Sequence, residues 1–180
     1  KNFFNFKENR IETGGVETYI LALSKVLKEL GYKVKIYQVS QQNFKKEFNN
    51  FTVYGINCDD KKYSEQKKII YDYIKLKFNK KQDLLIFGAD HFAVNTPFSN
   101  SISIQHGVSW DIDTSLLSSG DSWLKKTYEK AKRFKSFVSG YRNFIKVKNT
   151  VFVDYNFFNW MMTIPLQRKQ NFKVITNFVV

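Results

Sequence analysis

The fold is decided by residues 13–39, which read TGGVETYILALSKVLKELGYKVKIYQV. The apolar residues in the middle of this stretch recur three or four positions apart, as on one face of an α-helix: Val16, Ile20, Leu23, Leu27 and Leu30. Gly31 fits the position that directly follows a helix. After it, Val34 and Ile36 alternate with lysines, which predicts a strand over 33–39. The stretch therefore predicts a glycine-containing loop, a helix and a strand in succession.

The rest of the chain continues this alternation. Strands are predicted at 2–6, 51–56, 83–87, 101–105, 150–153 and 172–176, and helices at 63–78, 123–138 and 156–162. In the helix over 123–138 we expect Leu124, Tyr128 and Ala131 to face inward, and 42–50 to be a short connection. The order predicts an α/β fold: a Rossmann-like, doubly wound, mainly parallel sheet of about seven strands with helices on both faces. No linker rich in Pro, Gly and Ser interrupts the chain, so 1–180 is predicted to be one domain.

Composition and charge narrow the classes of protein. The 180 residues include 29 Lys and Arg against 16 Asp and Glu, a formal net charge of +13, which predicts an anionic partner. A single cysteine, Cys58, cannot form an intramolecular disulfide, and with two histidines it cannot complete the usual tetrahedral zinc sites. No stretch approaches the roughly 20 apolar residues of a membrane-spanning helix, and no signal peptide is visible. We therefore expect an intracellular protein. Since no Met opens the chain and apolar residues close it, we also expect it to be a fragment.

The loop before the first helix is one candidate ligand site. Gly14 and Gly15 would let the backbone approach a ligand closely, and the N-terminus of the next helix presents free N–H groups and a partial positive charge. That combination suits a phosphate, although neither the dinucleotide fingerprint nor a P-loop is present. The alternative interpretation is a tight turn before an ordinary helix.

Three further candidates follow predicted strands, where parallel sheets bind their ligands. His106, followed by Gly107, would point into the cleft as a hydroxyl ligand or an acid–base group, unless loop backbone satisfies it. Asp90 and His91 are better explained by capping and packing. Asp154 is expected to cap the helix that follows it.

A basic stretch between Lys125 and Lys148 contains nine Lys and Arg residues, with Glu129 as its only acid, and so holds +8 of the net charge. Aromatic residues are interleaved with these charges. The interpretations are an anionic membrane surface, a nucleic acid, or a solvated helix face with inward aromatics. Membrane contact is favoured over nucleic acid, since no nucleic-acid motif accompanies the charge. The membrane patch is predicted at Lys125, Lys126, Lys130, Lys132 and Arg133.

Taken in order, several segments resemble the retaining GT-B glycosyltransferases of family four. They are Gly14-Gly15-Val16-Glu17 with the helix and strand that follow, Asp83 to Phe87, Ile104-Gln105-His106-Gly107, and Lys173-Val174-Ile175-Thr176-Asn177. The resemblance spans nearly the whole chain. Thr176, Phe178 and Val180 stand where the family usually has Pro, Gly and Asp.

The resemblance implies an acceptor-binding N-terminal domain of a nucleotide-sugar-dependent hexosyltransferase. Its nucleotide-sugar domain would be absent from this chain, so the chain alone would be inactive. It implies His106 as the catalytic residue, and Gly14, Gly15, Glu17 and Gly107 as substrate-binding residues. The nucleotide-diphosphate sugar is a substrate, and no metal or other cofactor is implied. The acceptor would be a saccharide or lipid-linked sugar of bacterial surface-polysaccharide or glycolipid assembly. The protein would be cytoplasmic, peripheral on the inner face of the cell membrane.

Two rival functions stay open. The short chain without a catalytic carboxylate pair is also compatible with a stand-alone, flavodoxin-like module that binds a phosphorylated ligand. Nucleic-acid binding is motivated by charge alone, and we do not predict nucleic acid as a partner.

Overall fold

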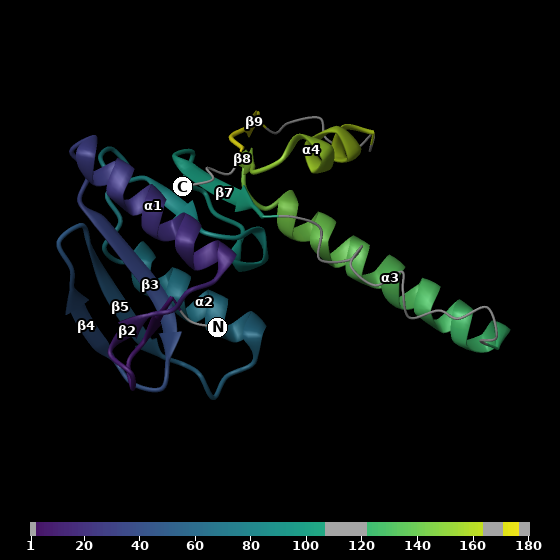
Figure 1. The fold of residues 1–180 in the computed structure, drawn as a ribbon, viewed down its shortest axis with the longest axis horizontal. Coiled ribbons are helices and arrows are strands. Elements are labelled where there is room, and N and C mark those ends of the chain that lie inside the picture. The colour runs from purple at the N-terminus through teal and green to yellow at the C-terminus, as the bar shows by residue number, and fades with distance from the viewer. Residues whose placement is uncertain (1–2, 107–121, 164–170, 177–180) are drawn as a thin grey trace. The chain divides into compact units, whose positions relative to one another are not determined.

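The computed structural model describes residues 3–106, 122–163 and 171–176. The chain forms two compact units, Lys1–Asn79 and Lys80–Val180. Figure 1 shows the strands and helices along the chain. The first unit contains β1 to β5 with helices α1 and α2, and the second contains β6 to β9 with α3, α4 and a short 3-10 helix, η1.

Helix α1 (Gly15–Glu29) follows the predicted helix closely. At its end the Gly31 N–H donates to the Lys28 carbonyl and the Tyr32 N–H donates to the Leu27 carbonyl, both at 2.9 Å. These two bonds form a Schellman motif, which requires a left-handed residue after the helix. Gly31 supplies it with φ of 86°, a conformation that glycine adopts without steric cost. The glycine therefore ends α1 where the sequence predicts.

The sheet of the first unit has the order β3-β5-β4, with β3 (Val34–Ser40) parallel to β5 (Phe51–Asn57). β4 (Phe44–Glu47) pairs antiparallel with β5, so the prediction of an unstructured connection over 42–50 is wrong. Only four residues form β4, and two of them are lysines, which weakens the apolar signal of a strand.

Successive residues of β3 point to opposite faces of this sheet. Ile36 packs with the cluster that includes Ile20 and Leu21 of α1. Tyr37 instead stacks on Tyr54 and contacts Tyr73 of α2 (Tyr63–Lys75) edge-on. The two helices thus cover opposite faces of the sheet.

The predicted strand at 2–6 is shorter than expected and has a partner that the sequence did not reveal. β1 (Phe4–Asn5) pairs antiparallel with β2 (Arg10–Ile11). Phe4 is only 1% exposed and joins the aromatic core of this unit. The aromatic signal at the start of the chain therefore marked a core segment more than a long strand.

The second unit is built on a four-stranded parallel sheet in the order β6-β7-β8-β9. Its strands are β6 (Leu85–Phe87), β7 (Ser101–Gln105), β8 (Asn149–Phe152) and β9 (Asn171–Val174). The bounds of β7 are the predicted ones. A hydrophobic cluster joins Phe152 of β8 to Phe144 at the end of α3 and to Phe157 and Met161 of α4 (Tyr155–Met162).

Helix α3 (Trp123–Phe144) is longer than predicted and its inward face is different. Leu124 is 62% exposed, Tyr128 is 67% exposed and Ala131 is exposed as well, so the prediction that they face inward is wrong. The helix instead reaches the core through its last turns, where Gly140 and Phe144 are buried. Helical spacing identified the stripe of apolar residues, but spacing alone does not say whether a core lies against it.

The protein is therefore a mixed α/β protein with a parallel four-stranded sheet. Within the described residues, the remaining strands form a mixed three-stranded sheet and a two-stranded hairpin.

Candidate functional site

The carboxyl ends of β6, β7 and β8 bring several of the candidate residues to one edge of the second unit's sheet. Neighbouring parallel strands end at the same edge, so the segments after Phe87, Gln105 and Phe152 lie beside one another. These segments contain Gly88, His106 and Asp154. Open parallel sheets bind ligands at this edge.

His106 is half-buried at the end of β7, and its ring is held in place. Its Nε2 lies 2.7 Å from the carbonyl oxygen of Gly88, the residue after β6. Because a carbonyl only accepts, Nε2 carries the proton and donates it. The bond orients the ring across the ends of two neighbouring strands, as expected for a positioned site residue and equally for a histidine satisfied by loop backbone.

Asp90, which follows β6 at this edge, has an electrostatic interaction that the sequence did not predict. Burial lowers the pKa of Lys146, and the Asp90 carboxylate partly opposes that shift by favouring the ammonium form. Asp90 opens η1 (Asp90–Phe92) directly after β6, and its side chain is 15% exposed. The tertiary structure brings Lys146 within its electrostatic reach, and no spacing in the sequence could have linked these two residues.

Asp154 caps a helix and His91 packs against a neighbouring ring, as the sequence favoured. The Phe157 N–H donates to Asp154 Oδ1 at 2.7 Å, which confirms Asp154 as the cap of α4. The His91 side chain is 51% exposed, and its ring packs at a tilt against Phe92 with 4.3 Å between ring centroids. Neither needs a ligand to explain its position.

The glycine loop lies in the first unit, at the N-terminus of α1. Gly14 is the N-cap residue with extended backbone, and the Glu17 carboxylate folds back against it, where a Cβ on residue 14 would collide. Gly15 is exposed, and a Cβ there would meet no protein atom within 4 Å. Its φ is not positive either, so neither packing nor backbone conformation of the protein requires glycine at this position.

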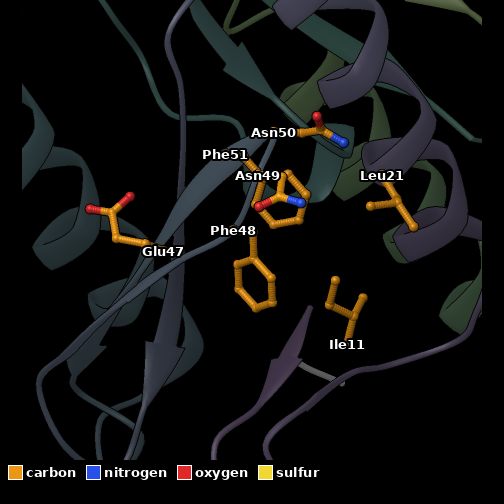
Figure 2. Close-up of a pocket in the computed structure, with 7 residues that line it drawn as sticks. All are labelled: Ile11, Leu21, Glu47, Phe48, Asn49, Asn50 and Phe51. Carbon is orange, nitrogen blue, oxygen red and sulfur yellow. The ribbon is translucent and has the colours of Figure 1, made fainter.

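A shallow hollow of about 360 Å³ also lies in the first unit, beside α1 and the turn between β4 and β5 (Figure 2). Ile11, Leu21, Phe48 and Phe51 gather there, while Glu47 points away from them. Glu47 instead accepts a hydrogen bond from Thr52 at 2.7 Å and pairs with Lys45. None of the predicted site residues lines the hollow, and it offers apolar contact without a converging charge.

The predicted basic patch lies on α3, and its described lysines are on the surface. Lys125, Lys130 and Lys132 are exposed, Lys126 is half-buried, and Lys132 pairs with Glu129 at 3.8 Å. Gly107 and the side chain of Arg133 lie outside the described part of the protein.

In residues 3–106, 122–163 and 171–176, no three of the His, Cys, Asp and Glu side chains come together as ligands for one metal ion. No helix within these ranges is both long and apolar enough to cross a bilayer. Compared with family models, curated proteins and solved structures, the chain has no match.

Proposed function

We propose that this chain is the acceptor-binding domain of a retaining, nucleotide-sugar-dependent glycosyltransferase. The observation that supports it best is Gly15, whose Cβ position is open space at the N-terminus of a 15-residue helix. Because the protein does not need glycine there, a ligand that approaches the backbone gives a reason for it. The helix N-terminus supplies the N–H groups and partial positive charge that an anionic ligand needs.

His106 is the residue proposed to act at the reacting sugar. Its bond to Gly88 leaves the ring in a defined orientation at the carboxyl edge of a parallel sheet. A group held in this way contributes to catalysis by positioning as well as by proton transfer. The resemblance assigns substrate contact to Gly107 and Glu17 too, and departure of the nucleoside diphosphate would be stabilised by backbone N–H groups and basic side chains.

The proposal includes a doubly wound, Rossmann-like domain over 1–180 that binds the acceptor. A second domain outside this chain would bind the nucleotide sugar. The acceptor class proposed is a saccharide or a lipid-linked sugar at the inner face of a cell membrane.

The test uses the protein expressed from its complete reading frame. We expect it to release a nucleoside diphosphate from one of a panel of UDP-, GDP- and ADP-sugars when acceptor is added. The 180-residue chain alone should release none. A reading frame without a second α/β domain after Val180 would refute the proposal.

Titration of the 180-residue chain with flavins and nucleotides distinguishes the transferase from its rival, a stand-alone binding module. Tight binding of FMN or of a free nucleotide by this chain alone would favour the flavodoxin-like binding module over the transferase.

A further inference from the structure

The first turns of α3 present apolar side chains that are exposed in the described part of the chain. Along the first four turns these residues recur three or four positions apart: Leu124, Tyr128, Ala131, Phe134 and Val138. Leu124, Tyr128 and Phe134 are 62%, 67% and 68% exposed, and Trp123 at the start of the helix is 72% exposed. This set, with Trp123, is called the α3 apolar face below.

The other side of the helix shows why this face points outward. Gly140 and Phe144 are buried, and they lie on the opposite side of the helix from Leu124 and Tyr128 at 3.6 residues per turn. Aromatic rings continue from Phe134 through Phe137 and Tyr141 to Phe144 with centroid distances of 6.3–6.4 Å. Packing with the domain thus fixes the last turns of α3, and that orientation presents the apolar face of the first turns to the surroundings.

Lys125, Lys130 and Lys132 border the α3 apolar face, and Lys135 lies within it. Lys125, Lys130, Lys132 and Lys135 are exposed on the same turns, and Glu129 is the only acid on the helix. Exposed Trp, Leu and Phe beside lysines on one helix are typical of helices that lie in the headgroup region of a bilayer. Each lysine near an anionic surface contributes about 1 kcal/mol to such binding.

We infer that α3 lies in the interface of an anionic lipid bilayer, with Trp123, Leu124, Tyr128 and Phe134 inserted among the lipids. The charge of the surrounding lysines complements anionic headgroups. Exposed Leu124 on this face favours lipid over nucleic acid, because nucleic acids bind aromatic rings by stacking and cations by charge rather than aliphatic side chains. The inference does not depend on the proposed transferase activity.

Sedimentation of the 180-residue chain with vesicles tests this inference. Vesicles of phosphatidylglycerol and phosphatidylcholine in equal parts should pellet the protein, and vesicles of phosphatidylcholine alone should not. The triple variant Leu124→Ser, Tyr128→Ser and Phe134→Ser should weaken binding by at least about tenfold, since apolar burial is lost. Leu76→Ser, at a residue that is 87% exposed on the first unit, is the control and should bind normally.

Charge reversal tests the contribution of the α3 lysines to vesicle binding. Lys130→Glu, Lys132→Glu and Lys135→Glu together should weaken binding by about a hundredfold or more. The matched control changes three exposed lysines of the first unit, Lys33, Lys35 and Lys75, to Glu and makes the same change in net charge. Circular dichroism checks that each variant is folded.

Tryptophan quenching by brominated lipids separates insertion from adsorption. Quenching should occur in anionic vesicles and fall in Trp123→Phe. Failure of the unchanged protein to pellet with anionic vesicles would overturn the inference, as would equal binding by all variants. Loss of a dimer in the serine variant, without vesicle binding by the parent, would show that a second copy covers the face instead. Salt-dependent binding to RNA without vesicle binding would overturn it in favour of nucleic acid.

Discussion

The side chain of Gln38 binds both backbone polar groups of Phe4. The Phe4 N–H donates to Gln38 Oε1 at 2.8 Å, and Gln38 Nε2 donates to the Phe4 carbonyl at 2.8 Å. The primary amide of glutamine carries the same donor and acceptor as a peptide group, so Gln38 of β3 binds β1 as a neighbouring strand would. Both residues are buried, with exposed fractions of 8% and 1%.

We expect Gln38→Leu to destabilise the protein by about 2–4 kcal/mol, because two buried backbone groups lose their partners. Gln41→Leu is the control. The Gln41 side chain is exposed, and its hydrogen bond to Asp59 Oδ2 is long, at 3.4 Å. Losing this bond should change the free energy of unfolding by less than about 0.5 kcal/mol. Urea unfolding measures both. Equal stability of the two variants would mean that Gln38 does not secure β1.

Gly15→Ala separates folding from ligand binding. Alanine forms helices better than glycine, and its Cβ meets no protein atom, so the free energy of unfolding should rise by about 0.5–1 kcal/mol. In the complete enzyme of the proposed function, the same methyl group should displace the substrate and so reduce the rate of sugar transfer by about a hundredfold.

Gly31→Ala is the matched control for Gly15→Ala. Its positive φ should make alanine destabilising by about 1 kcal/mol, while the rate of transfer per folded molecule stays unchanged. Full activity of Gly15→Ala would remove the main support for the proposed site.

His106 can be tested with two substitutions. His106→Ala leaves the Gly88 carbonyl without its donor and should cost about 1 kcal/mol of stability. His106→Gln retains an N–H donor and should recover stability without recovering transfer. Thermal unfolding and the rate of nucleoside-diphosphate release provide the two readouts. If His106→Gln restores both, the histidine is structural.

The pH dependence of Lys146 follows from its burial. Its pKa is lowered in the folded protein, so its ammonium form opposes folding at neutral pH, and this cost is relieved as pH rises through the folded pKa toward 10.5. Asp90→Asn removes an attraction for the ammonium and should lower the pKa of Lys146 further. NMR titration of the Lys146 side chain measures this shift. Glu129→Gln is the control, and an unchanged pKa in Asp90→Asn would contradict the pairing.

Local patterns predicted the regular elements well. The 3.6-residue period located α1 and α2, and the apolar run before Gly88 located β6. The Asp154 cap was predicted from residue type and position, because capping depends on neighbours three residues away. The prediction failed for β4, whose strand character depends on pairing with β5 rather than on its own lysine-rich residues.

The candidate site was predicted only in part, for a related reason. His106 was identified because it directly follows a buried strand, but its bond to Gly88 depends on the pairing of β6 with β7. The electrostatic interaction of Asp90 with Lys146 could not be predicted, since the two residues are distant in sequence and no pattern links them.

By itself, the sequence determined most of the helices and strands of this protein, but not β2 and β4, and it determined where α1 ends and that the charge concentrates on one helix. These properties depend on residues within a turn or two of each other. The tertiary structure decided which face of each element is buried. For α3 it packed Phe144 into the core and left Leu124, Tyr128 and Phe134 exposed, because burial depends on what the rest of the chain places against a face.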